Sequence, residues 1–119
     1  MSPAQRSPRW HVQRSLDHVA RLRAHLDRGL DLDDPLLHDA VSMQLIAAID
    51  ALIAANSVED GVVAAAFGDA WRRMVGMRNI LVHEYVIVDV DLLHSAATTE
   101  LDSLEEHARR LLDTLGSHE

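Results

Sequence analysis

Apolar residues recur at spacings of three and four along the chain, and this periodicity limits the fold more than any other feature. In the stretch from residue 9 to residue 28 they stand at Val12, Leu16, Val19, Leu22 and Leu26. A stretch that ends near Leu115 repeats the pattern. Because an α-helix completes a turn in 3.6 residues, this spacing places the apolar side chains on one helical face. The periodicity therefore predicts amphipathic helices.

Turn-forming residues mark where the first two helices end and begin. Gly29 is expected to terminate the first helix, because glycine favours the left-handed conformation found after helix ends. Asp33 or Asp34 is expected to cap a second helix, whose first turn accommodates Pro35. This second helix is expected to reach about Asn56 and is apolar nearly all round. Such a helix is either the centre of a bundle or part of an oligomer interface.

The second half of the chain is expected to hold a third helical region and a last helix. The third region covers about 62–83 and is interrupted near Gly68. A short β-branched connector at 86–90 follows, and Asp89 or Asp91 is expected to cap the last helix. Together these segments predict an all-α fold, a four- to five-helix bundle.

The length of 119 residues suits one domain. We assign residues 1–8 to a flexible N-terminal lead and residues 9–116 to a single helical domain. The chain has no cysteine, which excludes disulfides and thiolate metal sites. It has no run of 18 uncharged apolar residues and no apolar run at its start. We therefore expect a cytoplasmic protein without a membrane span or a secretory signal.

Charge is unevenly distributed along the chain. The net charge of −8 argues against general nucleic-acid binding. The first 30 residues nevertheless hold six arginines and two aspartates, a charge of +4. The remainder holds five arginines and 17 acidic residues, a charge of −12. A basic segment therefore adjoins an acidic body.

Histidine and arginine alternate along the first predicted helix, at His11, Arg14, His18, Arg21, His25 and Arg28. Residues seven apart lie about 10.5 Å apart along a helix, which is too far for two of them to share a metal ion. A solvated polar face accounts for the pattern. The alternative is a stripe that contacts RNA phosphates, with Arg14 and Arg21 as the contacts.

The stretch 71–85 carries the polar residues that are hardest to explain as surface filler, at Arg78, Asn79, His83 and Tyr85. Asn79 and His83 are four residues apart and share a helical face. Arg78 and His83 are five apart, which separates them by about 140° around the axis. A long arginine side chain that folds across, a helix that ends near His83, or a partner subunit would bring the two groups together.

Arginine and histidine together suit RNA cleavage without a metal or cofactor. The 2′-hydroxyl must lose a proton as it attacks phosphorus, and a histidine, which titrates near neutrality, can accept that proton or protonate the leaving oxygen. A fixed guanidinium can stabilise the charged phosphorane by paired hydrogen bonds. We therefore predict Arg78 and His83 as the catalytic pair. The alternative is a surface arginine and a helix-terminal histidine favoured by the helix dipole.

Residues 78–85, Arg-Asn-Ile-Leu-Val-His-Glu-Tyr, resemble the Arg-x4-His-x-Tyr motif of HEPN-superfamily toxins, and specifically of the HepT-like ribonucleases. The preceding Met-Val-Gly-Met at 74–77 and the following Val88-Asp89 also match that family's surroundings. The resemblance extends from about Asp39 to the end of the chain. The chain lacks the Gly-Glu-Ala signature of one family branch and has Ala-Ile-Asp-Ala at 48–51 nearby.

The resemblance implies a helical domain that forms a homodimer, with two Arg/His sets in one cleft. It implies an endoribonuclease toxin of a type II or type VII-like toxin–antitoxin pair that cleaves tRNA or mRNA. Arg78 and His83 would be catalytic, and Asn79 would support the active site. It also implies a minimal nucleotidyltransferase antitoxin that transfers AMP to Tyr85. A non-catalytic HEPN module that binds a nucleotide or a partner protein is the alternative.

Overall fold

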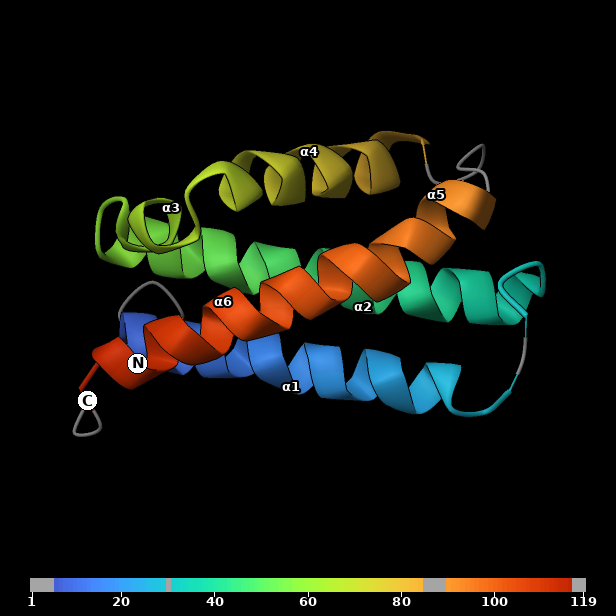
Figure 1. Cartoon of the computed structure of the whole chain (residues 1–119), viewed down its shortest axis with the longest axis horizontal. Helices are drawn as coiled ribbons and strands as arrows, with labels where there is room; N and C mark the ends of the chain where they lie inside the picture. The colour runs from blue at the N-terminus through green and yellow to red at the C-terminus, as the bar shows by residue number, and fades with distance from the viewer. Residues whose placement is uncertain (1–5, 30, 85–89, 117–119) are drawn as a thin grey trace.

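The computed structural model describes residues 6–29, 31–84 and 90–116, and its regular elements are all helical (Figure 1). In chain order they are α1 (Pro8–Leu26), α2 (Pro35–Val58), α3 (Val62–Phe67), α4 (Asp69–Glu84), α5 (Val90–Ser95), the π-helical turn η2 (Ala96–Glu100) and α6 (Leu101–Thr114). The prediction of an all-α bundle is confirmed.

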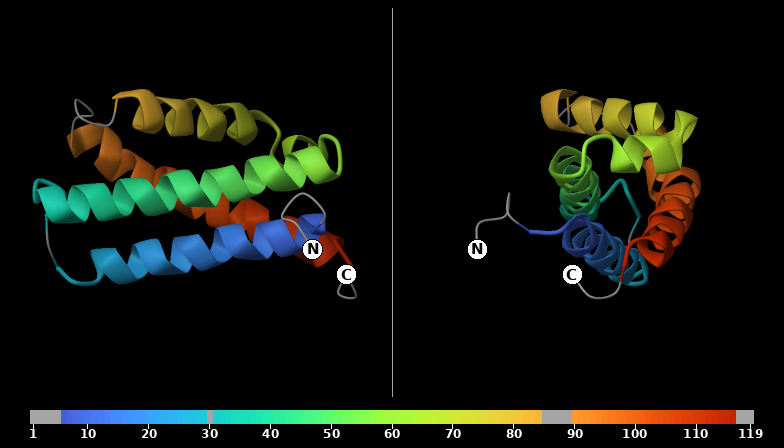
Figure 2. Two further views of the ribbon diagram at one scale, coloured as in Figure 1. Left: turned by 180° about the vertical axis from the view of Figure 1, so that it is seen from behind. Right: turned by 90° about the vertical axis from the view of Figure 1, so that its left-hand side faces the viewer.

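Helices α1, α2, α4 and α6 surround the core (Figure 2). The chain reverses direction between α1 and α2, so the two helices lie side by side and antiparallel, and α4 packs on the other flank of α2. α6 crosses the bundle opposite α2 and packs on α1. The core is mostly aliphatic, and many of its side chains have at most 1% of their surface exposed, among them Val12, Leu22, Leu45, Leu52 and Leu104. Packing of these apolar faces accounts for the bundle.

Capping side chains set where the first two helices begin. Ser7 Oγ accepts a hydrogen bond from Trp10 N at 3.0 Å, so α1 starts at Pro8, one residue earlier than expected. Asp34 Oδ1 accepts from Leu36 N at 2.9 Å, which identifies Asp34 and not Asp33 as the cap of α2. Each cap satisfies amide groups that have no partner inside the helix.

Glycine conformations mark two of the predicted breaks. Gly29 lies after α1 with φ of +77°, the left-handed conformation expected there. Gly68 has φ of +59° and separates α3 from α4, as the interruption predicted at this point requires. Most of the predicted connector at 86–90, with Asp89, lies outside the described residues.

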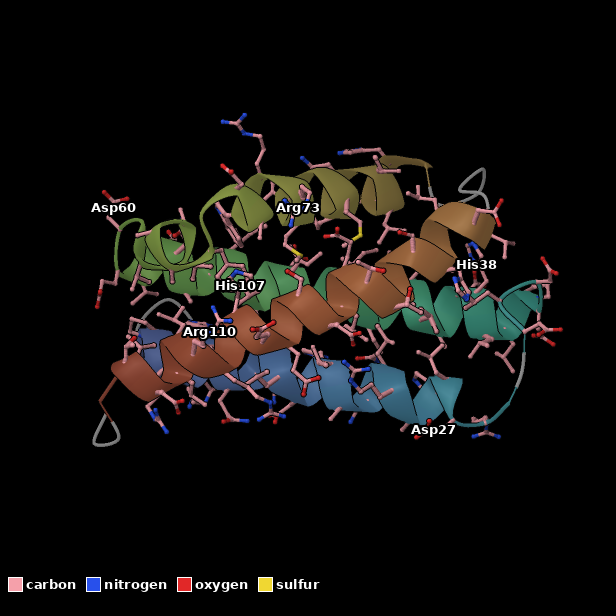
Figure 3. The ribbon with its side chains drawn as sticks, viewed as in Figure 1. Asp27, His38, Asp60, Arg73, His107 and Arg110 are labelled. Carbon is pink, nitrogen blue, oxygen red and sulfur yellow. The ribbon has the colours of Figure 1, made fainter. Side chains whose placement is uncertain are left out.

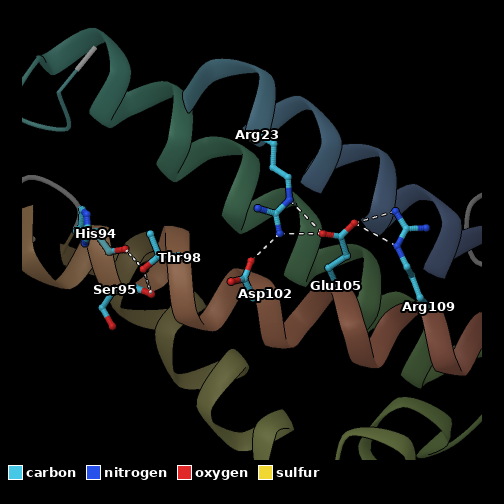
Figure 4. Close-up of polar contacts among 7 residues, drawn as sticks. All are labelled: Arg23, His94, Ser95, Thr98, Asp102, Glu105 and Arg109. Atoms are coloured by element: carbon cyan, nitrogen blue, oxygen red, sulfur yellow. Dashed lines mark hydrogen bonds and ion pairs between the residues drawn. The ribbon is translucent and has the colours of Figure 1, made fainter. Parts of the chain in front are cut away.

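The last helix contains a wider turn that periodicity did not predict. α5, η2 and α6 follow one another without a break, and η2 is π-helical. Thr98 Oγ1 donates to the main-chain oxygen of His94 at 2.7 Å, one turn earlier (Figure 4). A hydroxyl that bonds to the main chain of the preceding turn competes with the regular main-chain hydrogen bonds of the helix. π-Helical turns of this kind are frequent at functional sites.

α2 is more apolar than the bundle requires. By length and composition alone it could cross a membrane, although 39% of its most apolar stretch is buried inside the bundle. Asp50 interrupts that stretch, so α2 contains no run of 18 uncharged apolar residues. The side of α2 that faces neither α1 nor α4 leaves Leu36 75% and Met43 61% exposed. We call this side the open face of α2.

Candidate active site

The guanidinium of Arg78 is held at two points. Its Nε donates to Asp50 Oδ1 on α2 at 2.7 Å, and its NH1 donates to Asn79 Oδ1 at 3.1 Å. The Arg78 side chain is 28% exposed and that of Asp50 is 45% exposed, so the pair lies at the surface of the bundle. Neither bond uses NH2. The guanidinium is therefore held through Nε and NH1, and NH2 stays available to bind an anion.

The packing of α4 on α2 places this pair. Met74, Met77 and Leu81 face the core from α4, and Ile49 does so from α2. Arg78 follows Met77 and Asp50 follows Ile49, so both polar side chains lie next to buried neighbours at the rim of the core. Because buried side chains pack at nearly fixed positions, the two helices hold the carboxylate of Asp50 and the guanidinium of Arg78 at a fixed position relative to each other.

Asn79 and His83 are exposed on the outer side of α4. They are four residues apart, so they are neighbours along one face. α4 ends at Glu84, one residue after His83, so Arg78 and His83 both lie on the helix and are separated by about 140° around its axis. The Arg78 side chain reaches the adjacent Asn79, one turn before His83. No contact joins the Arg78 and His83 side chains among the described residues, so the routes by which the two groups would meet stay predictions.

Tyr85 lies outside the described residues. Arg14 and Arg21 are described, and they are exposed on α1. α1 and α4 pack against different flanks of α2, as the end-on view in Figure 2 shows. The structure therefore brings Arg78 and Asn79 together, one turn from His83, and leaves Arg14 and Arg21 on a separate helix.

An open groove adjoins the arginine. It lies between α2 and α4 with a volume of about 480 Å³ and is lined by Asp39, Ser42, Met43, Ile46, Leu81 and Val82. Ile46 is one turn from Asp50, and Val82 is one turn from Arg78, so the groove lies about one helical turn from the ion pair along the seam between the helices. Ser42 Oγ is buried there without a hydrogen-bond partner among the described residues.

Asp50 is the residue that sequence reasoning missed. Its position next to Arg78 depends on the pairing of two helices that are 28 residues apart at this point. A signal was present, because Asp50 is the only ionisable residue between Ala40 and Val58. A single charge in such an apolar helix needs a partner or solvent.

The site offers a fixed cation and an exposed imidazole. Within the described parts of the chain, no three His, Cys, Asp or Glu side chains form a group that could hold a metal ion. A guanidinium with an available donor nitrogen binds phosphate, and an imidazole transfers protons near neutral pH. This arrangement suits transfer of a phosphoryl group with acid–base assistance.

Comparison with known families identifies the chain. The family described as ribonuclease HepT-like matches residues 12–111, which are most of this chain. The chain belongs to the HepT-like ribonuclease family. The matched region of this HepT-like chain contains Asp50, Arg78, Asn79 and His83. No curated protein and no solved structure matches it.

Proposed function

We propose that this HepT-like chain is a metal-independent endoribonuclease toxin of the cytoplasm, with Arg78 and His83 as its catalytic pair. The observation that carries the proposal is the guanidinium of Arg78, which Asp50 and Asn79 fix one turn from an exposed histidine. The family match supports ribonuclease activity as a class. The Arg-x4-His-x-Tyr spacing supports the assignment of roles to these residues.

The proposed reaction is an internal transfer at one phosphodiester. The 2′-oxygen gives its proton to a base and attacks the adjacent phosphorus, and the bond from phosphorus to the 5′-oxygen breaks. The products are a 2′,3′-cyclic phosphate and a 5′-hydroxyl, which takes up a proton. His83 accepts the first proton or supplies the second. NH2 and the remaining hydrogen of NH1 on Arg78 bind the charged phosphorane.

We propose that the chain acts as a homodimer through the open face of α2. This face is apolar, and several of its positions are small, at Ala40, Ala47, Ala51 and Ala54. Small residues allow close approach of a second helix, and a second copy would cover Leu36 and Met43. The groove beside Arg78 borders the same face, so the dimer would form a cleft that both active sites share.

The dimer can be tested with one added charge. Met43→Glu places a carboxylate on the open face of α2, where Met43 is exposed and contributes little to the core. We expect light scattering to show monomers for this variant and dimers for Ala24→Glu, which adds the same charge at an exposed position of α1. A wild-type chain that is monomeric at working concentration would contradict the interface.

We propose that a minimal nucleotidyltransferase antitoxin neutralises the toxin at Tyr85. The phenolic oxygen would attack the α-phosphorus of ATP, which transfers AMP to Tyr85 and releases pyrophosphate. Tyr85 is two residues after His83, so an added nucleotide would lie near the catalytic histidine. Intact-mass measurement after co-expression with the antitoxin should show adenylyl increments that Tyr85→Phe abolishes.

The nuclease proposal is tested by cleavage of cellular RNA with unmodified protein. Arg78→Ala and His83→Ala should each lose activity while they remain folded dimers. Arg72→Ala is the control, because Arg72 is an exposed arginine on the same helix with no ion pair in the described structure. Undiminished cleavage by either catalytic variant would reject the assigned roles. Nucleotide binding without RNA cleavage by the wild type would favour a non-catalytic module.

A further inference from the structure

Most arginines outside the first 30 residues face an acidic group. Arg73 on α4 points to the last helix, with Nε 3.5 Å from Glu100 Oε1 (Figure 3). The other arginines of this part that pair with acids in the described structure are Arg78, Arg109 and Arg110. Arg72 is the exception. Most arginines after residue 30 therefore have their charge neutralised by a neighbouring acidic side chain.

The arginines of α1 divide into two groups by the side of the helix that they occupy. Arg23 faces α6, where its NH2 lies 2.9 Å from Asp102 Oδ1 and 2.8 Å from Glu105 Oε1 (Figure 4). Arg14 and Arg21 make no ion pair within the described residues, and both are exposed. Nine residues separate Arg14 from Arg23, which is about 180° around a helix. The unpaired arginines thus lie on the side of α1 away from the acids of α6.

The unpaired arginines form a row. Arg14 and Arg21 are seven residues apart, two helical turns, so they share a face at a spacing of about 10.5 Å. Arg28 follows at the same interval just after α1 ends, and it is exposed. We call Arg14, Arg21 and Arg28 the α1 stripe.

Trp10 extends the α1 stripe towards the start of the helix. The guanidinium of Arg6 lies 4.4 Å from the centre of the indole ring, and that of Arg14 lies 5.4 Å from it. These cation–π contacts hold two cations close together. Because both guanidiniums lie over the indole, the ring serves to position charge and is not an open platform for stacking a base.

The segment that carries the α1 stripe has more cations than acids. On its α2 side, His18 Nδ1 lies 2.9 Å from Gln44 Oε1, and Ala40, Ala47 and Ala48 are near Gln44 on α2. The two aspartates of the segment, Asp17 and Asp27, form no ion pair within the described residues, and Asp17 Oδ1 accepts a hydrogen bond from Gln13 at 3.1 Å. Because the first 30 residues hold six arginines against these two aspartates, the positive field of the row is only partly cancelled locally.

We propose that the α1 stripe binds the sugar–phosphate backbone of RNA, independently of base sequence and apart from the cleavage site. The inference rests on the proposed ribonuclease function and adds how RNA is held. Evenly spaced cations on a straight helix suit a polyanion with a regular repeat. The acidic body would otherwise repel RNA, so its capture depends on this local patch.

The test measures binding of 2′-O-methyl RNA, which lacks the attacking hydroxyl, by fluorescence anisotropy at several salt concentrations. Arg14→Gln/Arg21→Gln removes two cations from the stripe. Its plot of log affinity against log salt should be shallower than that of the wild type by about 1.4, because each single-strand phosphate contact contributes about 0.7. Arg109→Gln/Arg110→Gln makes the same change of charge on α6, where both arginines are paired. This control should keep the wild-type slope.

Binding and cleavage together separate this inference from the nuclease proposal. A stripe variant with the wild-type slope overturns the inference, whether or not the protein cleaves RNA. The inference is also overturned if the α6 control shows the same decrease in the salt-dependence slope as the stripe variant. It is overturned as well if the wild type binds an acidic peptide and not 2′-O-methyl RNA. A reduced slope only in the stripe variant supports the inference even if cleavage is absent. For an active wild type, we expect KM to rise in the stripe variant and kcat to stay unchanged.

Discussion

The bond between Asp50 and Arg78 makes Asp50 a positioning residue whose contribution to catalysis can be worked out from its geometry. Asp50→Asn keeps an oxygen acceptor near Arg78 Nε but removes its charge. Both side chains are partly exposed, so the pair should contribute only about 0–1 kcal/mol to folding stability. The variant should therefore fold normally, with a melting temperature close to that of the wild type.

The effect on the reaction should be larger than the effect on folding. A hydrogen bond to a charged acceptor is stronger than a neutral one by about 1.4 kcal/mol, which is about tenfold in rate when the bond orients a catalytic group. Asp50→Asn should thus lower kcat about tenfold. Asp50→Ala, which leaves Nε without its partner, should approach the loss of roughly 100-fold expected when a transition-state donor is removed. KM should stay constant or fall, because a negative charge near the phosphate is gone.

The assay is steady-state cleavage of a labelled RNA at several substrate concentrations, which gives kcat and KM separately. Asp113→Asn is the matched control, because it makes the same charge change at an exposed position of α6. Asp50→Ala with wild-type kcat and an intact dimer would refute the reasoning that the carboxylate positions the arginine. A fall in kcat of the same size in Asp113→Asn would attribute the effect to net charge.

Three further predictions concern stability. Leu52→Ala removes a fully buried core side chain and should lower the free energy of unfolding by about 2–5 kcal/mol in urea, whereas a loss under 1 kcal/mol would contradict its place in the core. Ser15→Ala removes a buried hydroxyl that donates to a main-chain oxygen of α2 at 2.8 Å and should cost about 1 kcal/mol; an increase in stability would show that this bond is not formed. Hydrogen bonds from Arg109, and then from Arg23, lower the pKa of Glu105 despite its partial burial. Because its folded pKa is lowered, the stability from Glu105 is present above its unfolded pKa and is lost as pH falls through the folded value, so thermal melts of Glu105→Gln and wild type should converge in acid and diverge near neutrality.

The helices could be predicted from the sequence because the forces that define them are local. Spacings of three and four set the apolar faces, and the side chain of Asp34 and the positive φ angles of Gly29 and Gly68 act within a few residues. The π-helical turn η2 was not predicted, because apolar periodicity carries no signal for a single widened turn.

The candidate site was predictable only within one helix. Arg78, Asn79 and His83 belong to a motif that can be recognised along the chain, whereas Asp50 becomes part of the site only because α2 packs on α4. Periodicity places each residue on a face of its own helix. It does not say which helix that face meets.

The sequence by itself determined the helical class, most of the helix boundaries and the spacing of the motif, since these depend on neighbours a turn or two away. Tertiary structure decided which charges are paired. It joins Arg23 to the acids of α6, joins Arg78 to Asp50, and leaves Arg14 and Arg21 exposed. The physical reason is that ion pairs act over a few ångströms between side chains, and only the packing of helices brings residues distant in the chain within that range.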